Sequence, residues 1–287
     1  SGVIDVTGNR RHRSGKPFSL SEQSQLKFEM SSIGVPVPPG FTITTETCDE
    51  YFQNGNTYPD GLEKEVMEHL DRLEKLMGKK LGDAKDPLLV SVRSGAAESL
   101  PGMMDTVLNL GMNDGAVKGL AEVSGNKRFA WDAYRRFIQM FSDVVKGTSI
   151  EPYEKALEAM KKAKGVEEDT ELDADDLAKL TTEYKEIFKK ATGEDFPQDP
   201  VKQMWDAIGA VFGSWNNPKA VTYRRINDIK GLLGTAVNIV SMVYGNLGDD
   251  SGTGVCFSRD PSTGEKVFYG EYLMNAQGED VVAGIRT

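Results

Sequence analysis

Residues 88–106 of the chain are LLVSVRSGAAESLPGMMDT, and this stretch decides the fold. Its first part, Leu88–Val92, is a short apolar run of the kind that forms a buried strand. The run leads directly into Arg93 and Gly95, which places a cation and a permissive backbone at a strand's end. Because α/β proteins often carry their chemistry at strand ends, we expect a functional site here.

The residues after this strand suit the binding of a polyphosphate. Arg93 offers a planar fork of donors that matches phosphate oxygens. Gly102 and Thr106 allow a backbone and a hydroxyl group to approach an anion closely. The stretch matches neither GxGxxG nor the Walker pattern. From the residues alone, a structural ion pair of Arg93 with Glu98 or Asp105 explains the arginine equally well.

A second candidate segment is the β-rich run of residues 234–244. An apolar strand that continues into a connector can offer adenine its backbone N–H and C=O groups between apolar walls such as Met242 and Val243. An ordinary buried strand is the alternative interpretation.

A third candidate segment is residues 270–280, which is rich in polar side chains. Glu271, Glu279 and Asp280 can supply oxygen ligands to Mg²⁺, which binds through one or two carboxylates together with substrate phosphates. A polar hairpin tip explains these acids nearly as well.

Hydrophobic periodicity and turn signals predict the remaining elements, and together they indicate an α+β fold. A rigid turn at 34–41 leads into a strand at Thr42–Thr45. An acidic run at 167–176 is expected to be a solvated loop and helix start. We expect helices at 61–77, 125–146, 151–164, 176–191 and after Pro200, and strands at 234–244, Val255–Arg259, Val267–Leu273 and Asp280–Arg286.

The composition limits the class of protein. The 287 residues are 39% hydrophobic and 27% charged, an ordinary globular balance. No apolar run approaches the ~20 residues that a bilayer span needs. The formal net charge of -10 argues against a nucleic-acid partner, because clustered Lys and Arg bind phosphate backbones. Cys48 and Cys256 have no metal-ligand spacing, so a reducing compartment is expected.

The first 30 residues differ from the rest of the chain. Little apolar periodicity is present, and a basic patch lies among Gly and Ser, made of Arg10, Arg11, His12, Arg13 and Lys16. A disordered segment, a segment imported from elsewhere and a transit-peptide remnant all remain open. Asp5 and Glu22 weaken the last interpretation, because transit peptides are poor in acids.

Taken together, these segments resemble the N-terminal nucleotide-binding domain of pyruvate, phosphate dikinases, which is ATP-grasp-like. The similarity covers about residues 30–287 and rests on Pro38–Thr42, Val92–Ala96 with Pro101–Thr106, and Gly252–Val255 with Asn275–Asp280. The Gly-Met-Met-Asp-Thr form distinguishes these enzymes from phosphoenolpyruvate synthases and rifampin phosphotransferases.

The resemblance implies a reaction and a set of site residues. The domain would pass the β,γ-pyrophosphoryl group of ATP to a histidine of a swivelling central domain, leaving AMP. The histidine would then pass a phosphoryl group to pyruvate in a third domain and yield phosphoenolpyruvate. The implied cofactors are ATP and Mg²⁺, with no metal ligand assigned. Arg93 would be catalytic, and the ATP-binding residues would be Arg93, Gly102, Asp105, Thr106, Val240, Met242, Val243 and Glu279.

The same resemblance divides the chain into four segments. Residues 1–30 are a divergent N-terminal segment. Residues 31–114 with 201–233 form an N-terminal α/β subdomain, and 115–200 form a helical subdomain. Residues 234–287 form a β-rich ATP-grasp subdomain that is truncated at its C-terminus.

The chain departs from the family pattern in three places. The family's Gly-Gly-Lys-Gly loop should stand at 21–24, where Gln23 replaces the ATP-binding lysine. Val240 stands where the family usually has Gln. The family's metal-binding acidic strand would lie beyond Thr287. Because losing a charge-assisted phosphate contact costs about 1.5–3 kcal/mol, we expect little phosphoryl transfer by this chain alone.

Two functions follow as hypotheses. One is the ATP-binding domain of a dikinase, a phosphotransferase. The other is a catalytically silent nucleotide-binding or regulatory module of the same fold, which the Gln23 substitution motivates. The resemblance further implies a homodimeric full enzyme in the cytoplasm or in an organelle such as a plastid or glycosome. Its partners would be ATP and the phosphohistidine and pyruvate-binding domains, with no nucleic acid and no membrane.

Overall fold

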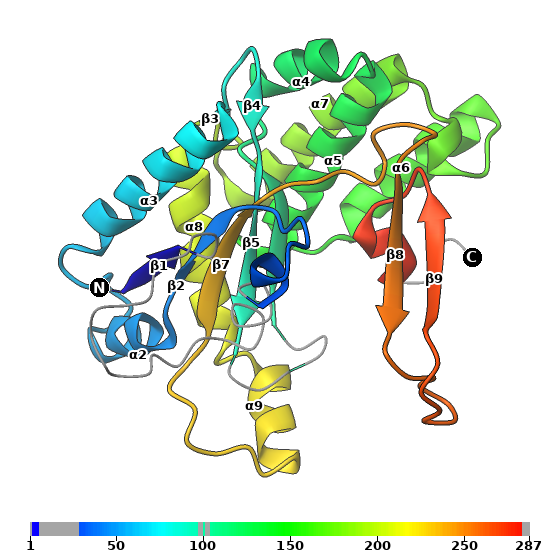
Figure 1. Cartoon of the computed structure of the whole chain (residues 1–287). Coiled ribbons are helices and arrows are strands. Elements are labelled where there is room, and N and C mark those ends of the chain that lie inside the picture. The colour runs from blue at the N-terminus through cyan, green and yellow to red at the C-terminus, as the bar shows by residue number, and fades with distance from the viewer. Residues whose placement is uncertain (1, 6–28, 97–99, 101–103, 283–287) are drawn as a thin grey trace.

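The chain folds around a five-stranded antiparallel sheet flanked by helices, with a separate β-hairpin to one side (Figure 1). This computed structural model describes residues 2–5, 29–96, 100 and 104–282. The strands are β1 (Val3–Asp5), β2 (Gly40–Ile43), β3 (Lys80–Leu81), β4 (Pro87–Leu88), β5 (Val90–Gly95), β6 (Thr106–Leu110), β7 (Ala236–Ser241), β8 (Gly252–Phe257) and β9 (Tyr269–Met274). The helices are α2 (Thr45–Gln53), α3 (Leu62–Met77), α4 (Ala116–Ser124), α5 (Lys127–Val144), α6 (Glu151–Lys164), the 3₁₀ turn η1 (Asp169–Glu171), α7 (Ala174–Thr192), α8 (Pro200–Ser214), α9 (Pro218–Ile226) and α10 (Gly278–Val282).

The order of the large sheet is β1-β2-β7-β5-β6, so β7 arrives last in the sequence but lies at the centre. β7 pairs with β2 on one side and with β5 on the other, both antiparallel. All six residues of β7 are buried, which agrees with its mixture of β-branched and small residues. The sheet is therefore complete only after residue 236.

One face of the sheet is apolar and covered by helices. Phe41, Ile239, Val92 and Val107 are cross-strand partners in one row, and all four are fully buried. Phe41 contacts the ring of His69 in α3, with centroids 5.7 Å apart, which places this row against the helices. Because side chains alternate along a strand, the next residue of each strand faces the other way.

A second layer is formed by α4, α5, α6 and α7, with α5 in contact with β6, α4 and α7. α5 begins at the cap Asn126, whose side chain accepts a hydrogen bond from the Phe129 N–H at 3.0 Å. Phe129, Phe137 and Phe141 lie on its buried face. α5 therefore carries residues that face both the core and the edge of the sheet at β6.

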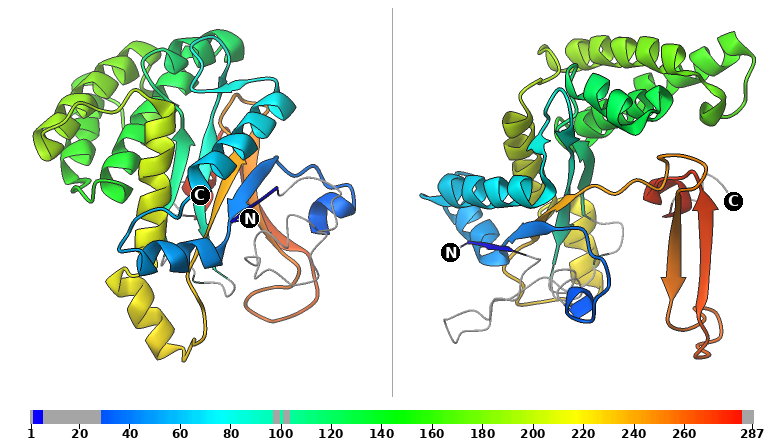
Figure 2. Two further views of the ribbon diagram at one scale, coloured as in Figure 1. Left: turned by 90° about the vertical axis from the view of Figure 1, so that its left-hand side faces the viewer. Right: turned by 45° about the horizontal axis from the view of Figure 1, so that its top comes forward.

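The C-terminal hairpin β8–β9 stands apart from the five-stranded sheet, as the right view of Figure 2 shows. In the part of the chain that the structure describes, its strands pair with each other alone, with Val255 opposite Glu271. The short helix α10 follows β9 and contacts β8. Phe268 is 83% exposed and Tyr272 is 75% exposed, so much of the hairpin's apolar surface is open.

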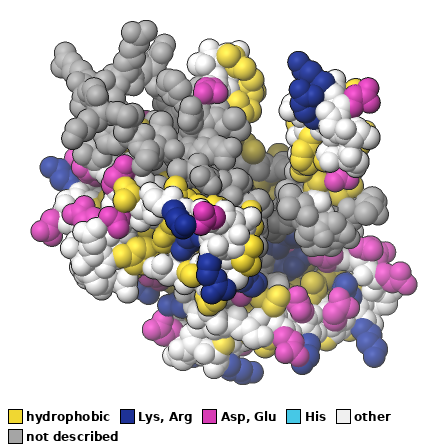
Figure 3. All heavy atoms as spheres, turned by 90° about the horizontal axis from the view of Figure 1, so that it is seen from below, with side chains coloured by type: hydrophobic (Ala, Val, Ile, Leu, Met, Phe, Trp, Pro, Cys, Tyr) yellow, Lys and Arg dark blue, Asp and Glu magenta, His cyan; other side chains and the backbone are white. Residues whose placement is uncertain are grey.

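The lower face of the molecule, seen in Figure 3, mixes apolar and basic side chains. α9 lies at this end and exposes Val221 and Ile226. Its last turn carries Arg224 and Arg225. Among the described residues, no helix combines the length and the apolar character that crossing a membrane would require.

Most of the predicted elements are present, but three are wrong or incomplete. The strand predicted at Thr42–Thr45 ends at Ile43, because Thr44 caps helix α2 in extended backbone. Arg93 lies inside β5, which continues to Gly95, and is not at the strand's end. Asp280 and Val281 belong to α10 instead of a strand, since the Asp280 carboxylate accepts the N–H of Gln277 and starts a helical turn.

Two further expectations need correction. Val3–Asp5 form β1 and pair with β2, so the segment 1–30 contains at least one ordered strand. In the acidic run, Asp173 caps α7 as expected, but Asp176 is buried and lies 2.7 Å from Lys164. Asp169 also pairs with Arg135 at 2.8 Å. Part of this run is therefore held by cations and is not simply solvated.

Candidate functional site

A row of polar side chains crosses the sheet on the face opposite to the apolar row. Thr42, Asn238, Arg93 and Thr106 are successive cross-strand partners on β2, β7, β5 and β6. The Thr42 hydroxyl donates to the Asn238 side-chain oxygen at 2.7 Å. Arg93 is exposed, although its neighbour Val92 is fully buried. The pairing of β5 with β6 thus brings Arg93 beside Thr106, two residues that the sequence predicted for one site.

The next row on this face contains Gly40, Val240 and Ser91. The Arg93 Nε donates to the Ser91 Oγ at 3.2 Å, and that hydroxyl donates to the Val240 carbonyl at 3.4 Å. A Cβ on Gly40 would meet the backbone of Ile239 and Val240, so glycine allows β2 to pack closely here. Val240, which the family resemblance places among the ATP-binding residues, therefore lies on the same face as Arg93.

After β7 the chain becomes a connector toward the hairpin. The Met242 N–H donates to the Leu89 carbonyl at 2.9 Å, which holds Met242 next to β5. Val243 is 70% exposed, so it offers an open apolar surface. Tyr244 packs edge-on against Phe129 at 5.0 Å, and burial raises the pKa of its phenol. The connector is thus anchored at both ends, with Val243 open between them.

Asp105 precedes β6 and is partly buried. Burial raises its pKa, the nearby Asp143 raises it further, and Lys219 opposes the shift. The Asp105 carbonyl accepts the Ser94 N–H at 3.3 Å. In the described part of the chain, no ion pair joins Arg93 to Asp105. A structural ion pair with Asp105 is therefore not what positions Arg93. Glu98 lies outside the described residues.

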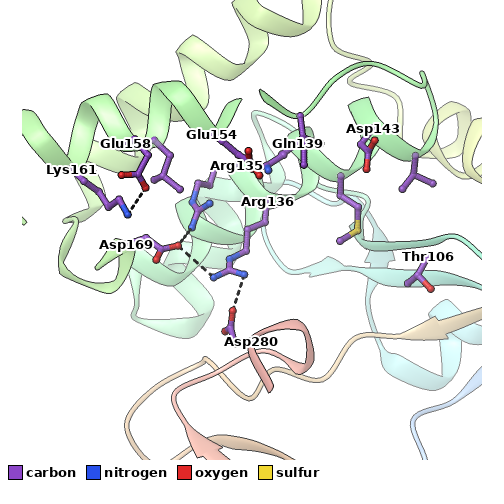
Figure 4. A pocket seen from close by; sticks show the side chains of 14 residues that line it. Thr106, Arg135, Arg136, Gln139, Asp143, Glu154, Glu158, Lys161, Asp169 and Asp280 are labelled. Atoms are coloured by element: carbon purple, nitrogen blue, oxygen red, sulfur yellow. Dashed lines mark hydrogen bonds and ion pairs between the residues drawn. The ribbon is translucent and has the colours of Figure 1, made fainter. Parts of the chain in front are cut away.

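A cavity of about 620 Å³ opens beside Thr106, which is in the range of small-molecule sites (Figure 4). Figure 4 shows Thr106 at one end and Arg136 and Lys161 toward the other, with Asp280 of α10 below. Its walls come from β6, α5, α6, η1 and α10: Thr106, Arg135, Arg136, Gln139, Met140, Asp143, Val144, Ile150, Glu154, Leu157, Glu158, Lys161, Asp169 and Asp280. The lining combines apolar side chains with the cations Arg135, Arg136 and Lys161, each of which is paired with a carboxylate.

Sequence reasoning missed the arginines of this cavity. Arg135 donates to Asp132 and Asp169, each at 2.8 Å. Arg136 donates to Asp132 at 3.1 Å and to Asp280 at 3.2 Å, so it joins α5 to α10. The sequence does contain a signal for this pairing. Asp132 and Arg135 fall among the buried positions of the helix that carries Phe129 and Phe141, where an unpaired charge would be costly.

Some predicted site residues cannot be placed. Gly102 lies outside the described residues, as does Gln23 with the loop around it. The backbone of Glu279 belongs to α10, next to Asp280, while its side chain is outside what the structure describes. Glu271 lies on β9 of the separate hairpin.

The metal prediction can be compared with the donor groups that the structure places together. In the described ranges, no cluster of three or more His, Cys, Asp or Glu side chains could hold a metal ion. Asp280, one of the predicted Mg²⁺ ligands, is instead paired with Arg136 at 3.2 Å. The described residues therefore do not fit a protein-built Mg²⁺ site.

Comparison with known proteins identifies the family. Residues 55–287 match the family model described as pyruvate phosphate dikinase, AMP/ATP-binding domain. The chain is 58% identical to pyruvate, phosphate dikinase of Clostridium symbiosum over 260 residues, which are 90% of this chain and 30% of that protein. It is 58% identical to the chloroplastic enzyme of Flaveria trinervia over 283 residues, which are 98% of this chain and 29% of that protein.

The chloroplastic enzyme of Mesembryanthemum crystallinum is 60% identical over 259 residues, which are 90% of this chain and 27% of that protein. The chain thus spans less than a third of the length of these curated relatives. Nothing in the matches favours a silent module of the same fold. The expected resemblance is confirmed: the chain belongs to the pyruvate phosphate dikinase family, as its N-terminal AMP/ATP-binding domain.

Proposed function

We propose that this chain binds ATP for a dikinase and presents its β,γ-pyrophosphoryl group to a histidine of another domain. The observation that carries the proposal is the shared sheet face of Arg93, Thr106 and Val240. A polyphosphate end and an apolar end for the base therefore lie on one surface. The whole reaction forms phosphoenolpyruvate from pyruvate. We propose that it is carried out by a longer protein, as long as the relatives described above.

In the proposed site, Arg93 holds the polyphosphate. Its guanidinium neutralises phosphate charge, and Ser91 orients the guanidinium through the bond to Nε. The Thr106 hydroxyl donates to a phosphate oxygen at the mouth of the cavity. We further propose that Asp105 and Gly102 shape the loop around the phosphates, while Glu279 contributes a polar group from α10.

The base would lie against the connector. Val240, Met242 and Val243 supply apolar surface, and Val243 is the most open of the three. The backbone of the connector supplies donors and acceptors for the edge of the base. This placement fits the anchoring of Met242 to β5.

The acceptor histidine must come from a different part of the enzyme. His69 is 8% exposed in α3 and its ring nitrogen pairs with Asp5, so it cannot act as acceptor. His12, the only other histidine, lies outside the described residues in the basic N-terminal segment. In the proposed step a bond forms from the imidazole nitrogen to the β-phosphorus. The bond from that phosphorus to the α–β bridging oxygen breaks, and AMP leaves with the oxygen.

The remaining proposals concern the setting of this domain. We propose that the residues separate into the subdomains 31–114 with 201–233, 115–200 and 234–287 around the ATP site. The metal ion is proposed to enter with the phosphates of ATP, since Mg²⁺ binds through one or two carboxylates together with substrate phosphates. This chain alone is proposed to transfer little phosphate, because Gln23 stands where the family has its ATP-binding lysine. The full enzyme is proposed to be a homodimer.

The compartment is proposed from the relatives. They include a bacterial protein and chloroplastic ones, which supports the cytoplasm or a plastid. They give no support to the glycosome.

Nucleotide-induced thermal stabilisation tests the proposed site. Saturation at 100 times the dissociation constant should stabilise the chain by about 2.7 kcal/mol. Arg93→Ala should lower the affinity for ATP by about tenfold or more, because a charge-assisted phosphate contact is lost. Arg72→Ala is the control, since Arg72 is an exposed arginine on α3 that pairs with Asp5. An unchanged ATP response in Arg93→Ala would disprove this placement of the polyphosphate.

A further inference from the structure

Asp132 is a buried carboxylate that holds two arginines at once. It lies on α5 and is 4% exposed. One carboxylate oxygen accepts from Arg135, with the Nη2 at 2.7 Å and the Nε at 2.8 Å. The other oxygen accepts from the Nε of Arg136 at 3.1 Å. Each oxygen thus fixes one guanidinium from the following helical turn.

The two arginines are used differently. The Arg135 side chain is 4% exposed, and its outer edge is taken by Asp169 at 2.8 Å. The Arg136 side chain is 18% exposed and directs its Nη1 to Asp280 at 3.2 Å, at the wall of the cavity. Asp132 therefore fixes the inner Nε edge of Arg136. Figure 4 shows the outer edge at the cavity wall, where Arg136 is linked to Asp280 and to Asp169, whose carboxylate lies 3.9 Å from the Nη2.

This geometry prepares a guanidinium for a bidentate partner. A solvent-exposed arginine loses about 2 kcal/mol of rotamer freedom when it is fixed, and a fixed fork loses less on binding. Asp280 now occupies the outer edge of Arg136 and comes from α10, a separate element. A ligand phosphate entering the cavity can take the same position, because it presents the same oxygen geometry.

We propose that Asp132 is a positioning residue, which touches no ligand and orients Arg136 so that its outer edge faces the ligand's polyphosphate. The inference rests on the proposed function, because it requires the polyphosphate to reach the cavity beside Thr106. Asp280 is then the protein anion that yields this edge when the nucleotide binds.

The test compares two ligands on the whole 287-residue chain. Calorimetry gives the dissociation constants of MgATP and of adenosine, which lacks phosphates. Asp132→Asn should weaken MgATP by about tenfold and leave adenosine unchanged, because a misdirected Arg136 affects only the phosphates. A loss of equal size for both ligands, or no loss, overturns the inference.

The matched control is Asp176→Asn. Asp176 is also buried in this helical layer and pairs with Lys164 at 2.7 Å, but it does not line the cavity. Its substitution should lower stability while the ratio of the two dissociation constants stays as in the wild type. A changed ratio in this control would mean that any buried charge in the layer affects binding, which would also overturn a specific role for Asp132.

A double-mutant cycle separates the two residues. Arg136→Gln should weaken MgATP about as much as Asp132→Asn does, and the double variant should show no additional loss. If Asp132→Asn still weakens MgATP when residue 136 is already Gln, Asp132 does not act through Arg136. If the wild type binds adenosine but not MgATP, or neither, the proposed function fails together with the inference. If Asp132→Asn binds MgATP as tightly as the wild type, the inference is wrong but the proposed function still stands.

A measurement on the unmodified chain covers the case in which Asp132→Asn does not fold. The side-chain ¹⁵N signals of Arg136 are followed by NMR during a titration with MgATP. The Nε–H should stay protected from exchange, because Asp132 holds it, while the Nη signals shift as Asp280 is exchanged for phosphate. Exposure of the Nε–H on binding, or an adenosine titration with the same Nη shifts, contradicts the inference.

Discussion

The two thiols of the chain are held in opposite environments. Cys48 in α2 is fully buried, and burial raises its pKa to about 12, although the Thr235 backbone opposes the shift. Cys256 on β8 is exposed. Because the thiolate is the reactive form, Ellman's reagent at pH 8 should titrate a single thiol in the folded chain and two after unfolding in urea. Cys256→Ser should leave none in the folded chain, and rapid reaction of both thiols without denaturant would be inconsistent with this packing.

Asp132 makes the free energy of unfolding depend on pH in the acidic range. Burial raises its pKa, but Arg135, Arg136 and Arg128 outweigh burial and lower the pKa from 3.8 to about 2. Because the folded pKa lies below the unfolded one, the ionised carboxylate stabilises the fold above pH 3.8, and this contribution is lost as the pH falls toward 2. The stability difference between wild type and Asp132→Asn should shrink by about 2 kcal/mol between about pH 5 and 2.

Urea unfolding followed by tryptophan fluorescence at several pH values measures this difference. Asp176→Asn serves again for comparison, since Asp176 is also a buried carboxylate and pairs with Lys164 at 2.7 Å. A difference between wild type and Asp132→Asn that is constant with pH would exclude a carboxylate that is ionised only in its folded environment.

The residues of the candidate site could be predicted only in part. Arg93, Thr106 and Met242 were predicted from their local sequence and Val240 from the family resemblance, and the pairing of β5 with β6 and β7 brings Arg93, Thr106 and Val240 together. The cluster of Asp132, Arg136 and Asp280 was missed, because Arg136 and Asp280 lie 144 residues apart in the sequence and meet only through the packing of α10 near α5. None of these three charged residues lies in a sequence motif that identifies its ion-pair partner.

At the scale of the element, two helical glycines differ sharply. A Cβ on Gly119 in α4 would lie 2.5 Å from the Ala84 carbonyl oxygen and 2.6 Å from that of Lys85. A Cβ on Gly213 in α8 would meet no atom within 4 Å. Gly119→Ala should destabilise the chain by about 1–3 kcal/mol, since the helix must move away from backbone. Gly213→Ala should stabilise it by about 0.5–1 kcal/mol, because alanine favours helix.

Both glycine variants are measured by urea unfolding with the wild type in the same series. The opposite signs make the pair its own control, because both substitutions add the same methyl group. Equal effects at the two positions would mean that α4 does not approach the 84–85 loop closely.

The sequence patterns predicted the long helices and several strands, but missed the short helices α2 and α4 and the strand β6. α3, α5, α6, α7 and α8 each carry an apolar face over at least 14 residues, enough for a clear period. α2 and α4 have nine residues each, and β6 has five. These lengths are too short to distinguish a helical from a strand-like period of apolar residues. In α10 the two valines favour a strand, but the Asp280 carboxylate on the Gln277 N–H decides for helix.

At the scale of the whole molecule, the site depends on three separate parts of the chain. β7 follows the helical layer in sequence yet lies between β2 and β5, so the sheet closes over a sequence separation of almost 200 residues between Thr42 and Asn238. The hairpin β8–β9 contributes little to that sheet and joins the body through α10 and the connector. The proposed ATP-binding face and the α10 wall of the cavity are therefore built by different units.

This division predicts the result of two truncations. A chain ending at Gly248 keeps the complete sheet, the Tyr244–Phe129 contact and the bond from Asn126 to the Leu247 carbonyl at 3.0 Å. It loses mainly the pair of Arg136 with Asp280, whose Asp132 partner remains, so the free energy of unfolding should fall by less than about 2 kcal/mol. A chain ending at Leu233 lacks the central strand β7, which leaves β2 and β5 without a shared neighbour. Circular dichroism with urea titration should show cooperative unfolding for the first chain and none for the second. An unfolded first chain would show that the hairpin is needed for the fold itself, while a folded second chain would contradict the central place of β7.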